Sequence, residues 1–173
     1  MLTLKVTKLR PFTDGDIDVL SALRNDLATQ TTLLALPRPS GVDRVRAWAT
    51  QSKEDHLFFV VADAKTNASL GFVQLAHLDL LHGTADLGIA LHDSARGKGH
   101  GRSAIALVER FGRDTFRIRK ISLTVLATNE AAIGLYRDSG YETVGTRRAH
   151  FYSAGRYHDV LLMEKQLPVA EVA

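Results

Sequence analysis

Hydrophobic side chains recur along the first part of the chain with two different periods, which separates expected strands from expected helices. Within residues 2–9 (LTLKVTKL), every second position from Leu2 through Leu4 to Val6 is apolar, as in an edge strand. Apolar residues then recur at helical spacing over residues 17–27, behind Thr13 and Asp16, which are spaced like a capping box. A second helical face follows over residues 42–49. The pattern therefore predicts one strand followed by two helices.

The middle of the chain reads as strands. Residues 27–40 contain two prolines and are expected to form a loop. A short apolar run over residues 56–63 predicts a buried strand. Residues 69–80 and 84–91 predict two more strands, joined by a hairpin near Gly83.

The last part of the chain alternates between the two periods. An apolar helix begins near residue 101, and residues 120–126 (KISLTVL) alternate as a strand does. A short helix ends at Gly140, which is typical of a left-handed C-cap, and two strands follow over residues 141–152 and 155–167. This order predicts an α/β fold: a mixed sheet of about seven strands with helices on both faces. We expect one domain over residues 1–173.

Composition narrows the classes of function. The chain has 173 residues, 45% of them hydrophobic and 24% charged, which is ordinary for a globular protein. It has no cysteine, so disulfides, thiolate zinc sites and cysteine nucleophiles are excluded, and a cytoplasmic location is expected. We expect neither a signal peptide nor a membrane span. The formal net charge of +3 favours an anionic ligand but is weak evidence for nucleic acid.

Residues 96–102 (RGKGHGR) alternate three glycines with basic or histidine side chains at an expected strand–helix junction. The first amides of a helix have no internal partner, and glycines let a phosphate approach them closely. The segment therefore predicts a pyrophosphate site, and the alternative is a glycine-rich connector with solvated charges. A P-loop requires a longer spacing and a lysine where Arg102 stands. The dinucleotide fingerprint fails as well, because the third glycine comes one residue early.

Residues 96–101 resemble the R/Q-x-x-G-x-G/A signature of the GNAT N-acetyltransferases, and the predicted element order is that family's order. Residues 145–164 further resemble the branch with ribosomal-protein N-terminal, spermidine and amino-sugar acetyltransferases. The resemblance implies an acyltransferase that uses acetyl-CoA as co-substrate, and we expect no metal. Backbone groups of the strand before the glycines would pair with the pantetheine arm. The cofactor-binding residues that it implies are Ile89, Ala90, Leu91, Arg96, Gly97, Lys98, Gly99, His100, Gly101, Arg102 and Asn129.

Tyr136 is the candidate general acid. A phenol titrates at about 10 and a thiol at about 8.5, so a tyrosine is un-ionised at neutral pH and can return a proton to the departing sulfur. The resemblance assigns the same role to Tyr136. Asn129 lies seven residues earlier, which predicts that both side chains share one helix face. The alternatives are a core aromatic at Tyr136 and a plain N-cap at Asn129.

The general base is less clearly indicated. Ribosomal-protein acetyltransferases carry a glutamate where this chain has Thr124, which cannot serve as a base. Asp86 could take the amine proton directly or through water, and a surface or capping aspartate is the alternative. Several histidines have a suitable pKa, but no spacing favours one of them. These are His77, His82, His150 and His158.

The acceptor is left open: a polyamine, an amino sugar, an aminoglycoside-like drug and a protein N-terminus all present a primary amine. No acidic run appears in the first two helices, which disfavours a polyamine. The pocket is expected between those helices, residues 37–39 and the last two strands. Its expected liners are Arg148, Tyr157 and Asp159, although Arg148 and Asp159 could simply pair with each other. A homodimer is a further expectation from the resembled branch.

Two other classes of function compete with the enzyme. Arg110, Arg113 and Arg117 form a basic helical face that could bind nucleic acid, but such a face is usually just solvated. We therefore expect no nucleic-acid partner. A catalytically silent acyl-CoA sensor would share the glycine segment, and it is the alternative to the enzyme.

Overall fold

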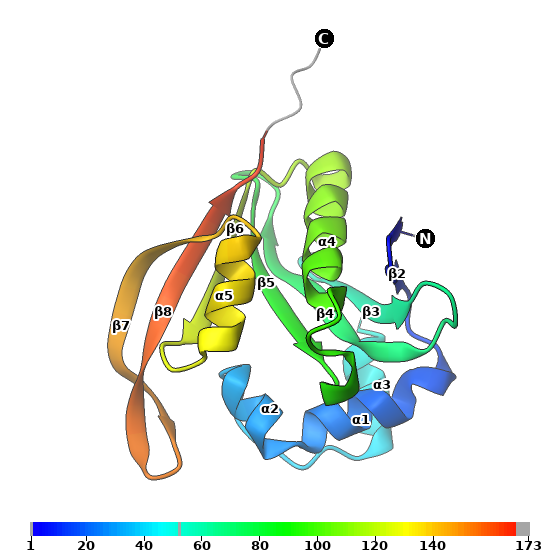
Figure 1. Cartoon of the computed structure of the whole chain (residues 1–173), viewed down its shortest axis with the longest axis horizontal. Helices are drawn as coiled ribbons and strands as arrows, with labels where there is room; N and C mark the ends of the chain where they lie inside the picture. Colours follow the sequence, from blue (N-terminus) through cyan, green and yellow to red (C-terminus); the bar gives the residue numbers. More distant parts are fainter. Residues whose placement is uncertain (1, 52, 169–173) are drawn as a thin grey trace.

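The computed structural model describes residues 2–51 and 53–168, and their strands form one eight-stranded sheet in the order β1-β2-β3-β4-β5-β6-β8-β7. Neighbouring strands are antiparallel except for β5 and β6, which are parallel. The predicted mixed α/β sheet is confirmed (Figure 1). The strands are β1 (Leu2–Leu4), β2 (Thr7–Arg10), β3 (Leu57–Asp63), β4 (Ser69–Asp79), β5 (Thr84–Leu91), β6 (Lys120–Leu126), β7 (Glu142–Ser153) and β8 (Arg156–Gln166).

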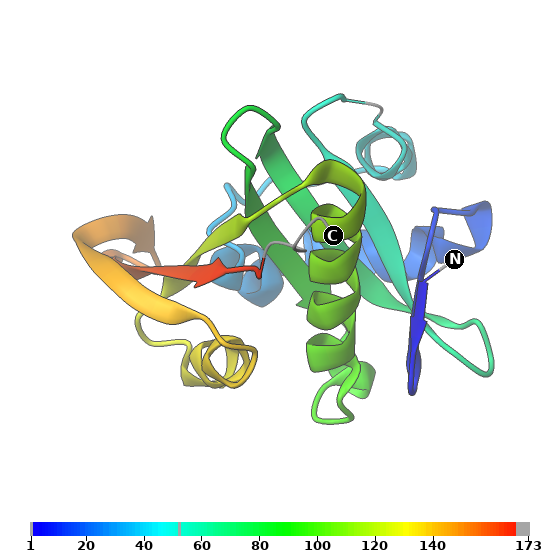
Figure 2. The same cartoon turned by 90° about the horizontal axis from the view of Figure 1, so that it is seen from above.

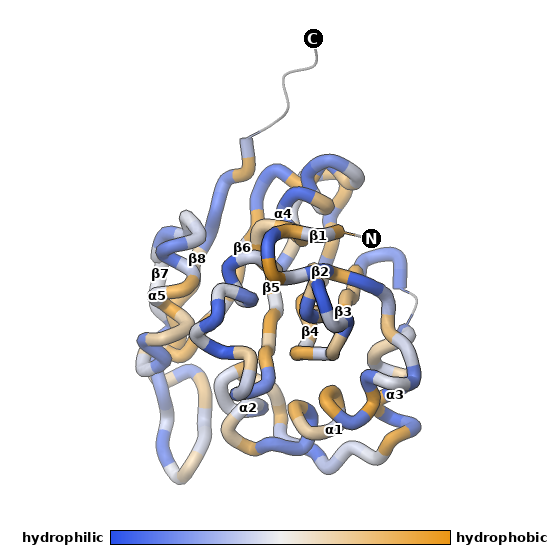
Figure 3. The backbone as a smooth tube through the Cα atoms, turned by 45° about the vertical axis from the view of Figure 1, so that its right-hand side comes forward, coloured by the Kyte–Doolittle hydropathy of each residue, from blue (hydrophilic) through white to orange (hydrophobic). Residues whose placement is uncertain are grey.

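Helices cover both faces of the sheet, as predicted, and Figure 2 shows the two layers from above. Helices α4 and α5 pack on one face with the larger hydrophobic cluster, and α1 and α3 pack on the other with a smaller cluster around Phe72. Hydrophobic positions are concentrated on the central strands (Figure 3). The helices are α1 (Ile17–Asn25), α2 (Leu27–Thr32), α3 (Val42–Ala49), α4 (His100–Phe116) and α5 (Glu130–Asp138), with short 3₁₀ turns at Asp14–Asp16 and Asp93–Ala95.

The first predicted strand is in fact a hairpin, which is why the sheet has eight strands rather than about seven. β1 and β2 pair with each other in antiparallel register, with Leu4 opposite Thr7. The turn between them places Lys5 at φ 50°, a left-handed conformation that breaks a continuous strand. The alternation of apolar residues across residues 2–9 did not reveal this reversal, because it continues through the turn.

The expected loop over residues 27–40 contains one helix that was not predicted. α2 begins after Asp26, whose carboxylate accepts a hydrogen bond from the Thr29 N–H at 2.7 Å. Asp26 is therefore an N-cap in front of a helix of six residues. The predicted hairpin between β4 and β5 and the left-handed Gly140 (φ 91°) after α5 are both confirmed.

A buried ion pair attaches α1 to the sheet. The Arg10 guanidinium on β2 donates to both carboxylate oxygens of Asp16, at 2.7 and 2.6 Å, and both side chains are buried. Asp16 also accepts the Thr13 N–H at 2.7 Å, and Arg10 reaches Asn67 in the turn after β3. Burial alone raises the pKa of Asp16, but the hydrogen bonds from Arg10 and Thr13 outweigh it and hold that pKa below its ordinary value.

No helix in the described part of the chain is long and apolar enough to cross a membrane. The expectation of one domain over residues 1–173 stays a prediction.

We expect Asp16→Asn to destabilise the protein by about 3 kcal/mol, because it leaves the buried Arg10 charge without its counter-ion. A carboxyl with a lowered folded pKa stabilises the fold above its unfolded pKa, near about 4, and loses that contribution as the pH falls through the folded value. Urea unfolding from pH 7 down to pH 3 should therefore show a shallower loss of stability for Asp16→Asn than for the wild type. Asp18→Asn, at an exposed carboxylate two residues later in α1, is the control and should unfold like the wild type.

Candidate active site

The central feature of the site is the divergence of β5 from β6. The two strands pair through three residue pairs, ending at Asp86 and Ser122, and then separate toward α2 (Figure 1). A cavity of about 360 Å³ lies where they diverge, and we call it the β5–β6 cavity. Beyond Asp86, one edge of β5 has no strand partner among the described residues. The walls of the β5–β6 cavity include Arg24, Thr32, Leu33, Ala35, Trp48, Phe72, Gln74, Ala76, His77, Asp86, Leu87, Gly88, Ile89, Thr124, Val125, Asn129, Ala132 and Tyr136.

β5 leads from this cavity into the glycine loop, which we define as residues 96–102. Gly97 and Gly99 have φ values of 71° and 81°, which a residue with a Cβ rarely adopts, and the space where a Cβ would stand is open at both. The first helical hydrogen bond of α4 runs from the Ser103 N–H to the Gly99 carbonyl. Within the described residues, the amides of residues 97–102 have no protein acceptor. They are therefore available to an anion at the N-terminus of α4.

The basic side chains of the glycine loop differ in their surroundings. Arg96 donates to the Leu91 carbonyl and pairs with Asp93, and Arg102 pairs with Asp138 at 2.5 Å. Lys98 has no ion pair within residues 2–51 and 53–168. The loop thus keeps one cation without a carboxylate partner.

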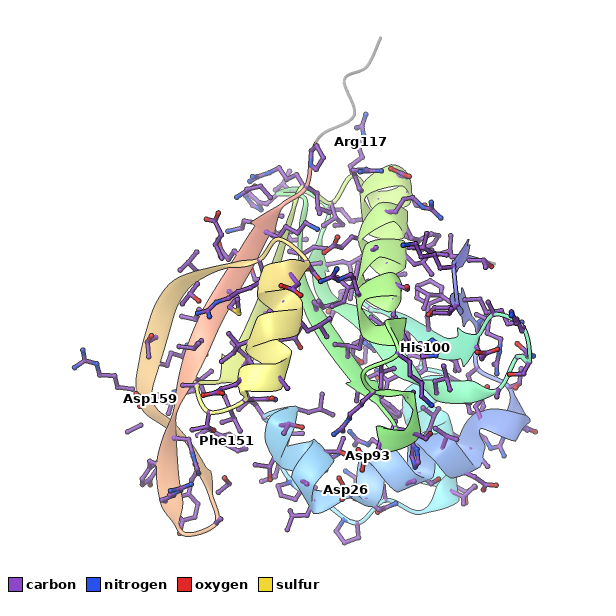
Figure 4. The ribbon with its side chains drawn as sticks, in the orientation of Figure 1. Asp26, Asp93, His100, Arg117, Phe151 and Asp159 are labelled. Atoms are coloured by element: carbon purple, nitrogen blue, oxygen red, sulfur yellow. The ribbon has the colours of Figure 1, made fainter. Side chains whose placement is uncertain are left out.

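The side chain of His100 does not face the glycine loop's open side. It is buried, and its Nδ1 lies 2.9 Å from the Thr7 hydroxyl on β2. The hydrogen bond ties the first turn of α4 (Figure 4) to the sheet. His100 could contribute its backbone amide to a bound anion, while its side chain has a structural role.

Tyr136 and Asn129 line the same cavity, although Asn129 stands just before α5 rather than within it. Asn129 is the N-cap of α5, and its side chain accepts the Ala132 N–H at 3.2 Å. Tyr136 lies in α5 with 8% of its surface exposed, and burial raises its pKa to about 12. Its ring also belongs to the larger hydrophobic cluster. Asn129 is therefore an N-cap and Tyr136 a core aromatic, as the sequence alternatives had it, and both residues also line the cavity.

The structure brings Asp86 and His77 together in the wall of the cavity. The Asp86 Oδ2 lies 2.9 Å from the His77 Nδ1, and both side chains are more than half exposed. His77 has φ 50° and sits where the register of β4 and β5 shifts between Ala76 and Asp79. This irregularity places a histidine beside an aspartate that is nine residues away in the sequence, so no local spacing could have indicated the pair.

The other candidates lie away from the cavity walls. His82 pairs with Asp79, His158 with Ser153, and His150 lies 3.5 Å from Arg147. None of these histidines lines the cavity as the described residues form it.

The predicted acceptor liners Arg148, Tyr157 and Asp159 are not among the cavity residues either. Asp159 accepts a hydrogen bond from the Ala149 N–H at 2.7 Å. Ala149 lies where the register of β7 and β8 shifts, so this hydrogen bond stabilises the irregular part of the hairpin. Figure 4 places Asp159 on the β7–β8 hairpin, with α5 between it and His100 in this view. Its role is structural, as the alternative had it, but its partner is a backbone amide rather than Arg148.

Sequence reasoning missed Arg24 and Gln74, and it assigned Trp48 only to a helix face. Trp48 packs edge-on against Phe72, with ring centroids 4.8 Å apart, and the Arg24 guanidinium lies 4.8 Å from the Trp48 ring centroid. The Gln74 Oε1 accepts a hydrogen bond from the His56 Nε2 at 3.2 Å. These residues come from α1, α3 and β4, so only the packed fold reveals that they line one cavity.

No group of three or more histidine, aspartate or glutamate side chains that could hold a metal ion occurs in the described part of the chain.

Comparison with known proteins places this geometry among acetyltransferases. The acetyltransferase (GNAT) domain family matches residues 7–142. The spermidine N(1)-acetyltransferase of Vibrio cholerae is 32% identical over 105 residues, which cover 61% of this chain and 60% of that protein. The L-methionine sulfoximine/L-methionine sulfone acetyltransferase of Pseudomonas aeruginosa is 26% identical over 158 residues, covering 88% and 90%. The structure of the Vibrio cholerae spermidine N-acetyltransferase with CoA and spermine superposes with a TM-score of 0.84 at 25% identity, covering 92% and 95%.

We expect Gly99→Ala to weaken coenzyme A binding by roughly fivefold or more, because a Cβ at φ 81° costs about 1 kcal/mol and displaces the free amides. Isothermal titration with coenzyme A measures the affinity. Gly155→Ala is a matched control, since Gly155 has φ 79° and equally open surroundings in the β7–β8 turn. Equal affinities for the two variants would contradict a role for the glycine loop in holding the pyrophosphate.

Proposed function

Because this chain belongs to the acetyltransferase (GNAT) family and is an acetyl-CoA-dependent N-acetyltransferase, we propose that its acceptor is a primary amine that attacks the thioester directly in the β5–β6 cavity. The observation that carries the proposal is that one cavity joins a buried tyrosine, Tyr136, to the Asp86–His77 pair. Two relatives are named for spermidine and for methionine sulfoximine or methionine sulfone, which support an amine acceptor.

The glycine loop fits the pyrophosphate of acetyl-CoA. Its amides from residue 97 to 102 have no acceptor in the described protein, and Lys98 adds a positive charge. The N-terminus of α4 contributes the equivalent of roughly half a positive charge. When bound, acetyl-CoA supplies an acetyl group activated as a thioester. The free edge of β5 at Ile89 would align the pantetheine arm by strand-like pairing, and Asn129 stands on the opposite wall.

Tyr136 is the proposed proton donor to the leaving sulfur. With a pKa of about 12, raised by burial, its hydroxyl stays protonated at any working pH. The same apolar surroundings raise the pKa of a coenzyme A thiol placed beside Tyr136, which brings the pKa of the thiol closer to that of the phenol. In the transfer, the C–N bond forms, the C–S bond breaks, and the sulfur takes the Tyr136 proton. The nitrogen gives up one proton as the amide forms, and that proton re-protonates the Tyr136 phenolate, so coenzyme A leaves as the thiol.

The Asp86–His77 pair is the proposed acceptor of the proton that the ammonium form of the acceptor must lose before it attacks the thioester. An alkyl ammonium has a pKa near about 10.4, so about one molecule in a thousand is nucleophilic at neutral pH. If His77 Nδ1–H donates to the Asp86 carboxylate, the Nε2 of His77 remains free to accept a proton. Asp86 then acts as a positioning residue that fixes the tautomer of the imidazole. The register shift between Ala76 and Asp79 in β4 brings the His77 side chain into contact with Asp86.

The alternative, a silent acyl-CoA sensor, would share the glycine loop but would not release thiol. An assay of coenzyme A thiol release with acetyl-CoA and a panel of primary amines separates the two. Acetyl-CoA should raise the melting temperature in both cases, because a ligand of the native state stabilises it by mass action. Amine-dependent thiol release supports the enzyme, and a melting shift without thiol release supports the sensor.

In that assay Tyr136→Phe should lower kcat by about 10²-fold or more, the usual contribution of a positioned general acid. The affinity for coenzyme A should stay within about twofold, because the variant keeps the ring that packs in the core. Tyr141→Phe, which removes the hydroxyl of the neighbouring tyrosine, is the control for lost stability, with ring centroids 6.0 Å apart. An unchanged kcat in Tyr136→Phe would remove Tyr136 from the acid role.

His77→Gln should lower kcat/KM at pH 7 by roughly 10²-fold and much less near pH 10, where the amine is largely deprotonated without help. Asp86→Asn should act in the same direction, since it disturbs the imidazole tautomer. His82→Gln, at a histidine with a similar aspartate contact outside the cavity, serves as the control. The same fractional loss at pH 7 and pH 10 would indicate a binding or structural role for His77 instead.

A further inference from the structure

Arg24 is a cation in the β5–β6 cavity without a counter-ion. It stands in the last turn of α1, its side chain is half-buried, and its guanidinium lies over the Trp48 ring. The Nε atom is buried and has no hydrogen-bond partner, and Arg24 forms no ion pair within the described residues. A buried donor without an acceptor is costly. Such an arrangement is stabilised when a ligand brings the missing anion.

The surroundings of Arg24 do not neutralise it. Burial, and then the neighbouring charge of Arg44, lower the pKa of its guanidinium, but an arginine stays charged in proteins. Asp86 is the single carboxylate among the described residues that line the cavity, and it is already hydrogen-bonded to His77.

Arg24 and Asp86 also lie at different levels of the sheet. Trp48, under Arg24, packs on Phe72, whereas Asp86 pairs with Ala76, which is four residues further along β4. That separation is about 13 Å at the usual rise of a strand. Asp86 pairs with His77, and no ion pair joins it to Arg24 among the described residues. Gly88 and its strand partner Gln74, which also line the cavity, lie between the two levels.

We propose that Arg24 binds a carboxylate of the acceptor, so that the substrate is a small amino acid rather than a polyamine. This inference rests on the proposed function, because it assigns the acceptor class of the same cavity. A guanidinium offers donors in a planar fork that matches a carboxylate, and charge-assisted hydrogen bonds of this kind are strong. A polyamine would instead add several positive charges next to a cation that is already unpaired. A protein N-terminus has no carboxylate on the residue that carries the amine, unless its side chain supplies one.

The test compares L-amino acids that have neutral side chains with their carboxamides and with spermidine. Thiol release gives kcat/KM, and titration of each compound into the protein saturated with coenzyme A gives binding without turnover. We expect the wild type to prefer the acids over the amides at least tenfold. Arg24→Gln should lower kcat/KM and affinity for the acids by roughly 10–100-fold and leave the amides nearly unchanged.

Two further variants sharpen the comparison. Arg24→Lys keeps the charge and should retain part of the preference for acids, which a merely structural loss would not. Arg44→Gln removes a neighbouring positive charge that does not line the cavity, and it should keep the full preference. Melting temperatures and coenzyme A affinities show that each variant is folded.

Several results would overturn the assignment while the proposed function stands. The first is a kcat/KM of the wild type for the amides or for spermidine that equals or exceeds its kcat/KM for the acids. The second is an unchanged preference for acids in Arg24→Gln. The third is a tenfold loss of coenzyme A affinity in that variant, which would assign Arg24 to the cofactor. If no amine is acetylated, the proposed function fails, and the titration still decides on Arg24. If the L-amino acids bind the wild type but not Arg24→Gln, the carboxylate site is supported. If they bind neither protein, or both equally, the carboxylate site is refuted.

Discussion

The site depends on the short pairing of β5 with β6. Both strands are held along their other edges, β5 by β4 and β6 by β8, over most of their lengths. Because those ladders fix each strand, the two cannot close on each other beyond Asp86 and Ser122. Backbone groups that face the gap are left for a ligand to pair with. The cavity, the free edge of β5 and the approach to the glycine loop all follow from this one interruption of the sheet.

Charge is distributed around that interruption in a consistent way. Unpaired amides and Lys98 lie at one end of β5, where a doubly charged linkage fits. Arg24 lies in the cavity wall next to Trp48, and the Asp86–His77 pair lies further along the same wall. Tyr136 remains neutral between these charged groups because burial opposes its ionisation. The arrangement suits a reaction in which a neutral amine is required and a proton must be returned to sulfur.

Local patterns in the sequence predicted the features that local physics determines. The glycines ahead of α4, the Thr13–Asp16 capping box, the Gly140 C-cap and the β4–β5 hairpin were readable, because spacing and residue type fix them within a few residues. The reversal at Lys5, the short helix α2 and the contact of His77 with Asp86 were not. Each depends on a single left-handed residue, on tertiary packing, or on a bulge between strands. Arg24 escaped notice for the same reason, since a basic residue in the last turn of a helix is ordinary until its neighbours are known.

The two hydrophobic clusters on opposite faces of the sheet have a consequence for how such a protein can diversify. One cluster supports α4 and α5, which carry the glycine loop and Tyr136, while the other supports α1 and α3, which carry Arg24 and Trp48. Substitutions in the second layer can therefore alter acceptor choice without disturbing the machinery for the acyl donor. Divergent descendants of one ancestral scaffold could retain a common donor while their acceptors change, through a modest number of replacements confined to a single side.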